Sequence, residues 1–319
     1  MKEKILTILE ENRGKSVSGG KMADTLGVTR AAVNKAVASL RAQGYQIEAV
    51  TGRGYRLAPE CDRLSAPGIR RWLKKDRDRT ILIYDEVAST NLTAKEVLPE
   101  CGDGALVLAQ RQSMGRGRMG RSFYSPQDMG VYMTIGLHPQ GPAEQTVFIT
   151  VAAAVAVSRA IDTLYGIKTQ IKWVNDIYYE GKKVCGILTE GTVEMESGGV
   201  AHAVLGIGIN TRYPKNGIPE ELEQKVGILP QGQGVTKNRL AAEVANQFDL
   251  LYERLYELEY LNEYREKSML IGRWVTALPI GGEPQDAEVL DIDGRARLVV
   301  RTEDGNVLTL SGGEVSIIP

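Results

Sequence analysis

The chain has 319 residues, of which 43% are hydrophobic and 25% are charged, and its formal net charge is -1. This composition excludes disordered, fibrous and membrane-embedded chains and predicts a soluble globular protein of two or three domains. The near-zero total hides an asymmetry. The first 57 residues hold ten Lys or Arg against five Asp or Glu, a local charge of +5, and the remainder carries -6.

Cysteine and histidine usage argues against disulfides and zinc. The cysteines are three, an odd number, with no C-x-x-C pair, so neither a disulfide framework nor a zinc cluster is expected and a reducing cytoplasm fits best. His138 and His202 have no second histidine or carboxylate at ligand spacing, so we expect no metal site built from histidine. The cysteines are Cys61, Cys101 and Cys185.

Neither a signal peptide nor a membrane span is expected. The most apolar stretch, residues 147–157, is stopped by Ser158 and Arg159. It is well short of the roughly 20 residues that cross a bilayer. The pattern therefore predicts a protein without a membrane partner.

The basic N-terminal segment predicts a winged helix-turn-helix domain over residues 1–60. Apolar residues at helical spacing indicate three helices, of which the second ends at Gly27. Thr29 is placed to cap the third helix, which ends at Gly44. Residues 45–57 contain two short strands around a glycine-rich turn, and such a hairpin is the wing.

Polar side chains of the third helix and the wing tip are arranged to contact DNA. They project away from the apolar stripe, as a recognition helix requires to reach base edges and phosphates in the major groove. One such domain reads few bases, so we expect a dimer on a palindromic operator. The expected DNA-binding residues are Thr29, Arg30, Asn34, Lys35 and Arg53.

The rest of the chain divides into a linker and two further domains. Residues 61–79 predict a linker with a short helix near 69–75. Consecutive strands within residues 80–270 favour an α+β domain with a mixed or antiparallel sheet, and short strands between glycine-rich turns predict a small β-barrel over 271–319. In the central domain, strands are expected at 80–84, 105–109, 131–137, 169–173, 183–190 and 200–209, and helices at 91–98, 143–164 and 236–267.

Residues 110–121 form a glycine-rich loop with four arginines. The loop contains G-x-G-x-x-G, but no apolar helix follows it, which excludes a dinucleotide-binding fold, and no Gly-Lys-Ser or Gly-Lys-Thr makes it a P-loop. Its amides and guanidinium groups suit ligands that carry carboxylate or phosphate. Taken alone, the loop fits RNA binding equally well.

Five motifs of the central domain, taken in this order, resemble the biotin protein ligases. With the winged domain in front, the chain is similar to the bifunctional class that is also the biotin-operon repressor. The resemblance spans the whole chain and implies a class II synthetase-like central domain and an SH3-like C-terminal barrel. The motifs are Ser89-Thr-Asn91, Gly115-Arg-Gly-Arg-Met-Gly-Arg121, Lys172-Trp-Val-Asn-Asp176, Gly181-Lys-Lys-Val-Cys-Gly-Ile-Leu188 and Gly206-Ile-Gly-Ile-Asn210.

The resemblance implies an ATP-dependent biotin-[acetyl-CoA-carboxylase] ligase. Biotin attacks MgATP to give biotinyl-5'-AMP, which then acylates a lysine of the biotin carboxyl carrier domain. Because both steps gather negative charge, preorganised cations contribute more than a covalent nucleophile. Lys183 matches the family lysine that contacts the carboxylate and the α-phosphate. Arg118 belongs to the closing loop, and Asp176 is expected to orient or deprotonate the incoming amine.

The remaining site residues follow from the same resemblance. For Ser89 and Thr90, helix capping is an alternative role that can coexist with binding. For Asp176 and Asn210, a purely structural role is the alternative. The expected biotin-binding residues are Ser89, Thr90, Asn91, Gln112, Arg116, Gly117, Arg118 and Lys183. The expected ATP and adenylate contacts are Gly115, Arg121, Phe123, Lys172, Asn175 and Asn210, with no protein-held metal.

Two positions depart from the family pattern. Phe123 stands where the family often stacks a tryptophan on adenine, and phenylalanine offers less area. Val174 stands where proline is common, so the loop that presents Asn175 and Asp176 is expected to be less rigid.

Three alternative functions remain open from the sequence. A lipoate-type ligase shares the chemistry, a biotin-sensing repressor without catalysis shares the domains, and a ligase with a non-functional DNA-binding domain shares both. The resemblance further implies partners: the carrier domain, a palindromic operator, and a second copy of the chain in a homodimer promoted by the adenylate, which acts as corepressor.

Overall fold

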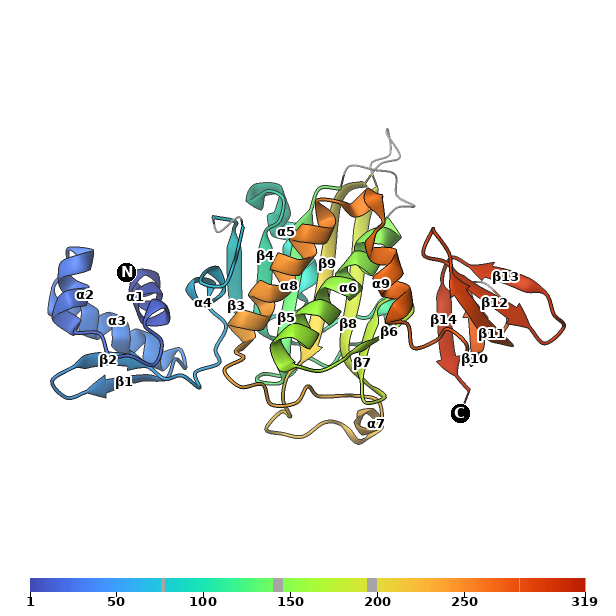
Figure 1. Ribbon diagram of the computed structural model, residues 1–319. Coiled ribbons are helices and arrows are strands. Elements are labelled where there is room, and N and C mark those ends of the chain that lie inside the picture. The colour runs from blue at the N-terminus through green and yellow to red at the C-terminus, as the bar shows by residue number, and fades with distance from the viewer. Residues whose placement is uncertain (76–77, 140–145, 194–199, 281, 319) are drawn as a thin grey trace.

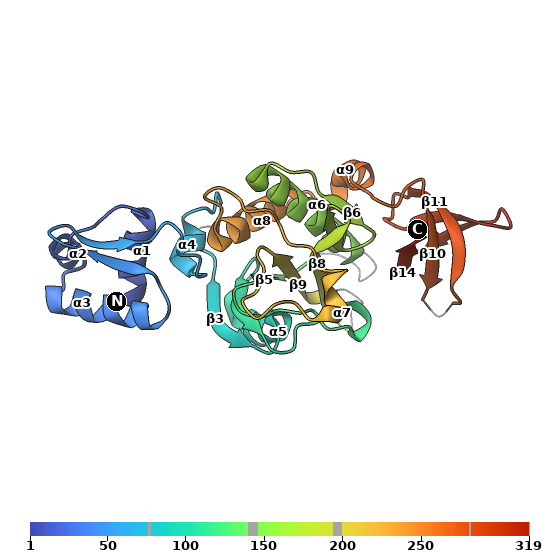
Figure 2. The same cartoon turned by 90° about the horizontal axis from the view of Figure 1, so that it is seen from below.

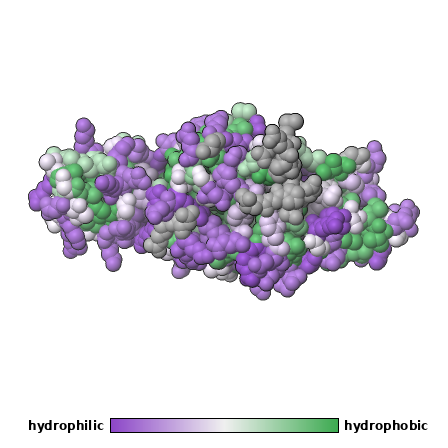
Figure 3. Space-filling view, turned by 90° about the horizontal axis from the view of Figure 1, so that it is seen from above, coloured by the Kyte–Doolittle hydropathy of each residue, from purple (hydrophilic) through white to green (hydrophobic). Residues whose placement is uncertain are grey.

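The computed structural model describes residues 1–75, 78–139, 146–193, 200–280 and 282–318. A small helical domain, a large central domain and a C-terminal sheet follow one another along the molecule (Figure 1). The same order is visible from below (Figure 2). From above, the surface is largely hydrophilic, with small hydrophobic patches toward both ends (Figure 3).

The N-terminal domain has three helices and a two-stranded wing, as predicted. The Thr29 hydroxyl accepts a hydrogen bond from the Ala32 amide at 3.2 Å and so caps the third helix. Gly27, with φ 62°, ends the second helix in the left-handed conformation that glycine tolerates. The elements are α1 (Lys2–Glu11), α2 (Gly19–Leu26), α3 (Arg30–Ala42), β1 (Ile47–Val50) and β2 (Gly54–Leu57).

The central domain is built on a seven-stranded mixed sheet with the order β3-β4-β5-β9-β8-β7-β6. The β3–β4 pair is parallel and the other neighbouring strands are antiparallel, which confirms the α+β prediction. The strands are β3 (Ile81–Val87), β4 (Leu106–Gln112), β5 (Gly130–Leu137), β6 (Gln170–Lys172), β7 (Asp176–Tyr179), β8 (Lys182–Val193) and β9 (Val200–Asn210).

The helices cover the two faces of this sheet unequally. The long helices α6 and α8 pack on one face and α5 packs on the other (Figure 2). They and the shorter helices are α4 (Ala66–Arg70), α5 (Thr90–Cys101), α6 (Thr146–Tyr165), α7 (Glu220–Glu223), α8 (Lys237–Tyr252) and α9 (Tyr260–Glu266), with 3-10 turns η1 (Arg118–Gly120) and η3 (Leu255–Glu257).

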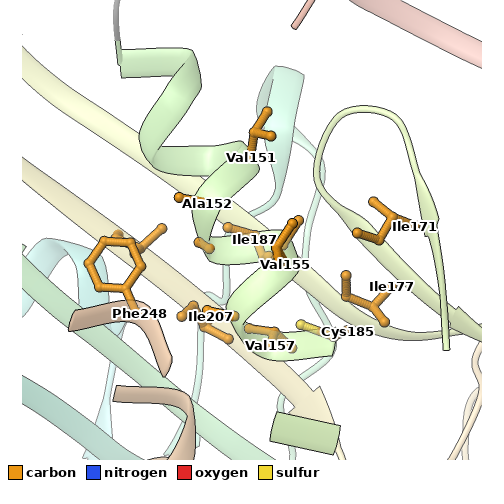
Figure 4. Close-up of a cluster of buried hydrophobic side chains, with 14 of the residues drawn as sticks. Val151, Ala152, Val155, Val157, Ile171, Ile177, Cys185, Ile187, Ile207 and Phe248 are labelled. Carbon is orange, nitrogen blue, oxygen red and sulfur yellow. The ribbon is translucent and has the colours of Figure 1, made fainter. Parts of the chain in front are cut away.

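The main core lies between α6 and the sheet (Figure 4). Cys185, Ile187 and Ile207 point from β8 and β9 toward this helix. Because side chains alternate along a strand, the residues between them face the opposite side of the sheet. Those residues include Gly186 and Gly208, and they lie on the face that α5 covers in part.

α6 is long and apolar enough to cross a membrane. The sequence estimate counted only the uninterrupted apolar stretch 147–157 and left out the rest of the helix expected to end near 164. The apolar window of α6 is 72% buried inside the protein, however. Such burial is typical of a core helix, because the sheet and α8 already cover the apolar surface of α6.

Two helix predictions need adjustment, and the start of a third is not tested. The helix expected over 236–267 is interrupted: α8 ends at Tyr252, and Leu258 adopts a left-handed conformation with φ 60° before α9 begins. The linker helix lies earlier than expected, because the Ser65 hydroxyl caps α4 by accepting from the Gly68 amide at 3.1 Å. The first residues of the helix expected over 143–164 lie outside the described residues.

The C-terminal domain is a five-stranded antiparallel sheet with the order β13-β12-β11-β10-β14. This agrees with the predicted run of short strands between glycine-rich turns. The strands are β10 (Trp274–Pro279), β11 (Gln285–Ile292), β12 (Leu298–Thr302), β13 (Val307–Leu310) and β14 (Gly313–Ile317).

Buried polar contacts join the winged domain to the central domain through the linker. Asn238 of α8 accepts from the Ser65 amide at 2.8 Å, and Ser65 donates its hydroxyl hydrogen to Glu10 of α1 at 3.3 Å. Asp62 accepts from the Lys237 amide at 2.6 Å and pairs with Arg212. Burial raises the pKa of Asp62. The winged domain is therefore docked against the central domain.

Candidate functional site

A cleft of about 970 Å³ opens on the α5 side of the central sheet. β4, the arginine loop, the β6–β7 connection, β8 and β9 all contribute side chains to it. Most of the site residues that the sequence predicted are brought together here. They are Ser89, Thr90, Asn91, Gln112, Arg116, Gly117, Arg118, Arg121, Phe123, Lys172, Asn175, Asp176 and Lys183.

One end of the cleft is organised by Gln112. Its Oε1 accepts from the Thr90 amide at 2.8 Å and from the Thr90 hydroxyl at 3.1 Å, while its Nε2 donates to the Ser125 hydroxyl at 2.9 Å. Ser89 occupies the N-cap position of α5 but its side chain makes no capping hydrogen bond. The Ser89 hydroxyl is thus not used by the helix and lines the cleft.

Asn91 is held in one orientation by its neighbours. Its Nδ2 donates to the Leu188 carbonyl at 3.2 Å and to Glu190 at 2.8 Å, and its Oδ1 accepts from Thr134 at 2.8 Å. Burial acts to raise the pKa of Glu190, but hydrogen bonds from Lys95 and Asn91 lower it. The Glu190 carboxylate therefore stays ionised and holds the side-chain amide of Asn91 in place.

The arginine loop folds over the cleft with its own hydrogen bonds. The Gly117 amide donates to the Arg121 carbonyl at 2.7 Å, and Met119 has φ 53° in the tight turn between them. Arg118 Nη1 donates to Asn175 Oδ1 at 3.2 Å, and Arg121 forms an ion pair with Glu314 of the C-terminal sheet. The loop thus touches two walls of the cleft.

Two lysines and one carboxylate meet at the opposite end. Lys183 Nζ lies 2.7 Å from Asp176 Oδ1. Lys172 is the cross-strand neighbour of Asp176, and its Nζ lies 5.8 Å from the centroid of the Tyr178 ring. Burial lowers the pKa of Lys172 and raises that of Tyr178 to about 12. This end of the cleft is suited to hold phosphate and carboxylate groups.

Phe123 lies on the floor of the cleft. A Cβ added to Gly208 would lie 2.4 Å from its ring, and one added to Gly186 would lie 3.1 Å from it. The two glycines are direct partners on β9 and β8. The ring therefore rests on backbone that only glycine leaves bare.

Two predicted residues lie behind the cleft and do not line it. A Cβ at Gly115 would lie 2.3 Å from the Phe123 carbonyl oxygen, so this glycine permits the close approach of the two loop segments. Asn210 is 4% exposed, and its Nδ2 donates to the Gly227 carbonyl at 3.1 Å. Asn210 therefore anchors the loop that follows β9, which is the structural role considered for it.

Two other segments line the cleft and were missed by the sequence interpretation. Both are distant in sequence from the motifs and carry no local signal of a binding site. In the loop after β9, the Lys183 amide donates to the Lys225 carbonyl at 3.1 Å, and the Gly227 amide donates to the Lys183 carbonyl at 2.7 Å. The missed residues include Leu222, Gln224, Lys225, Gly313, Glu314, Val315 and Ser316.

The predicted DNA-binding residues are on the surface of the winged domain. Arg30, Asn34 and Lys35 are exposed on α3, and Arg53 is exposed in the wing turn. Thr29 also serves as the cap of α3. A second cavity of about 530 Å³ is lined by Gly14, Lys15, Ser16, Ser18, Arg53 and Arg56. The exposed polar face of α3 and this basic hollow are suited to a polyanion.

Within the described parts of the chain, no cluster of three or more His, Cys, Asp or Glu side chains is placed to hold a metal ion. The three cysteines are free. Among the side chains that line the cleft, arginine and lysine carry positive charge.

Fold and cleft together define the class. The model for the biotin/lipoate A/B protein ligase family matches residues 84–210, and a helix-turn-helix domain model matches residues 2–56. The bifunctional ligase/repressor BirA of Bacillus subtilis is 35% identical over 96% of this chain and 95% of its own length. The protein of the same name from Escherichia coli is 29% identical over 95% of this chain and 94% of its own length. The chain belongs to this family of bifunctional ligase/repressors.

A solved structure gives the same fold. The biotin protein ligase from Aquifex aeolicus in complex with biotin and ATP covers 75% of this chain and 98% of that chain, with a TM-score of 0.63 and 24% identity.

Proposed function

We propose that this chain forms biotinyl-5'-AMP from biotin and ATP and transfers the biotin to a lysine of a biotin carboxyl carrier domain of acetyl-CoA carboxylase. The same chain represses biotin-synthesis genes, with the adenylate as corepressor. The observation that carries the ligase proposal is the convergence of Lys183, Lys172, Arg118 and Asp176 in one cleft beside the polar Gln112 end.

In the first step the biotin carboxylate attacks the α-phosphorus and pyrophosphate leaves. Lys183 stabilises the charge on both the carboxylate and the α-phosphate, and Arg118, which lines the same cleft, contributes from the arginine loop. Arg121 and Lys172 supply further positive charge for the leaving pyrophosphate. Mg²⁺ enters with ATP as part of the substrate.

In the second step the neutral amine of the acceptor lysine attacks the acyl carbon, and AMP leaves. Asp176 is 2.7 Å from Lys183, so its carboxylate is held by a cation. The contribution of Asp176 is to orient the incoming amine and to receive its proton as the bond forms. The arginine loop keeps water from the mixed anhydride.

The polar end of the cleft is suited to the ureido ring of biotin. Gln112 fixes Thr90, and the Ser89 hydroxyl remains available for the ligand. Fixed donors and acceptors of this kind recognise a neutral polar ring, which the dithiolane of lipoate does not offer. We therefore favour biotin over lipoate as the substrate.

The ligase proposal is tested by pyrophosphate exchange with biotin and with lipoate in parallel. Lys183→Ala should reduce biotin-dependent exchange by at least about a hundredfold, as the loss of one preorganised charge contact does. Lys182→Ala is the matched control, because Lys182 is adjacent and exposed and does not line the cleft. Equal activity of both variants would remove Lys183 from the mechanism, and exchange with lipoate alone would overturn the choice of substrate.

The repressor proposal includes a homodimer on a palindromic operator and a place of action in the cytoplasm. Adenylate binding is expected to favour the dimer, because a ligand stabilises the state that binds it better. Sedimentation with and without biotinyl-AMP measures this, and a gel shift with the promoter of a biotin-synthesis operon tests DNA binding. Identical self-association in both conditions contradicts the corepressor role.

A further inference from the structure

The floor of the cleft contains a patch of bare backbone that the protein fills with its own side chain. Gly186 and Gly208 are paired across β8 and β9, and neither has a Cβ on the cleft side. The Phe123 ring covers both, with its carbons 3.1 and 2.4 Å from the positions that Cβ atoms would take. A flat ring fits this flat patch because no side chain of the sheet separates them.

This patch lies between the two ends of the proposed substrate site. Gly206, two residues before Gly208 on the same face, lies under Asn91, whose Oδ1 is 2.3 Å from the position of an added Cβ. On the other side, the Lys183 amine is 3.3 Å from the corresponding position at Gly186. Along the floor of the cleft, the side chains therefore follow one another in the spatial order Asn91, Phe123, Lys183.

We propose that Phe123 is a specificity-determining residue: its ring occupies the path between the Asn91 end and Lys183, and a substrate must displace it to react. The proposal rests on the proposed function, since it takes biotin as the displacing ligand. A ligand that binds both at the Asn91 end and at Lys183 compensates for the contacts that the Phe123 ring loses when it leaves the glycines. A ligand held at one end leaves the ring in place, and its carboxylate does not reach Lys183.

Hydrogen bonds hold the backbone of the segment on which Phe123 lies. The Phe123 amide donates to the Gly115 carbonyl at 2.8 Å, and the Ser125 hydroxyl donates to the Phe123 carbonyl at 2.9 Å. The backbone is thus anchored on both sides, and neither hydrogen bond involves the Phe123 side chain. Rotation of the ring about χ1 moves it off the glycines without unfolding the loop.

Fluorine NMR tests the displacement directly in the full chain. The protein has three phenylalanines, so labelling with 4-fluorophenylalanine gives three signals. Phe148 and Phe248 lie in the core on the far side of the sheet and act as internal references. Biotin should shift the Phe123 signal and leave the other two unchanged. A Phe123 signal that stays in place at saturating biotin, with binding verified by calorimetry, overturns the inference while leaving the ligase proposal intact.

Removing the ring provides a second test, in which biotin binding and the KM for ATP are measured and biotin should bind more tightly while ATP binds less well. Phe123→Ala should bind biotin about tenfold more tightly. In the unmodified protein only those molecules whose Phe123 ring has left the glycines bind biotin, whereas every molecule of the variant is able to bind it. The KM for ATP should rise if the displaced ring packs on the adenine. Tyr124→Ala is the control, since Tyr124 is adjacent but does not line the cleft. Unchanged or weaker biotin binding by Phe123→Ala contradicts the proposal, because a merely structural role weakens both ligands. Absence of biotin binding by the unmodified protein would instead overturn the proposed function.

Discussion

The hydroxyl of Ser89 stands at a helix N-terminus without serving the helix. Serine at this position normally accepts a hydrogen bond from the first turn, and its loss costs about 1 kcal/mol. Here no such bond is made, whereas Thr236 caps α8 by accepting from the Arg239 amide at 3.2 Å. The side chain at the N-cap position thus caps α8 but does not cap α5.

Ser89→Ala should therefore lower biotin affinity with a change in unfolding free energy within about 0.5 kcal/mol. Thr236→Ala should do the reverse, with a loss of about 1 kcal/mol in stability and unchanged biotin affinity. Isothermal calorimetry and urea denaturation measure the two quantities. Equal destabilisation by both substitutions would mean that Ser89 acts as a cap in solution.

Single residues show where sequence reasoning about the site reached its limit. The motifs identified the side chains that converge in the cleft, because their spacing follows the strand ends that carry them. They did not reveal that Asn210 points to the Gly227 loop or that Glu314 reaches Arg121 from the C-terminal sheet. Both facts depend on contacts between distant segments, which no local pattern encodes.

β7 is a strand that the sequence prediction missed, whereas its partner β8 was expected over 183–190. β7 is a strand of four residues, Asp176–Tyr179, that lies directly after the Trp-Val-Asn segment, and its alternation is too short to recognise. The connecting residues Glu180 and Gly181 both have positive φ, 48° and 74°. Two positive values are typical of a type I′ turn, for which Asn-Gly is preferred.

Glu180→Asn should stabilise the protein by about 0.5 kcal/mol, because asparagine tolerates the left-handed conformation better than glutamate. Glu180→Gln is the matched control, since it keeps the length of the side chain and has no such preference. Thermal denaturation compares them. A melting temperature of Glu180→Asn at or below that of the control would show that the turn does not limit stability.

The interrupted helix before the C-terminal sheet has a different cause. Apolar residues recur at helical spacing from 236 to 267, so the pattern predicts one helix. In the structure, Leu255 and Tyr260 turn into the core and Leu258 takes φ 60° between them. Packing against α6 therefore overrides the local preference, as tertiary contacts commonly do.

At the scale of the whole molecule, the linker contacts make the winged domain part of a larger unit. Asp62→Ala removes the partner of Arg212 and of the Lys237 amide. The unpaired amide should cost about 1 to 3 kcal/mol and allow the winged domain to unfold first. Differential scanning calorimetry should show a separate low-temperature transition.

Glu48→Ala is the control for this prediction. Glu48 pairs with Arg56 on the wing, and both side chains are more than 40% exposed. Surface pairs of this kind contribute little, so the variant should melt like the unmodified protein. Identical profiles for Asp62→Ala and Glu48→Ala would mean that the junction contacts do not couple the domains.

The domain order has an electrostatic consequence. The winged domain lies at one end of an elongated molecule, so the +5 of the first 57 residues is separated along the long axis from the -6 of the remainder (Figure 1). Such a body is a permanent dipole, and the field of a DNA duplex exerts a torque on it. The approach to DNA is thus oriented before any base is read: the basic end turns inward, and the acidic ligase body is repelled to the solvent side.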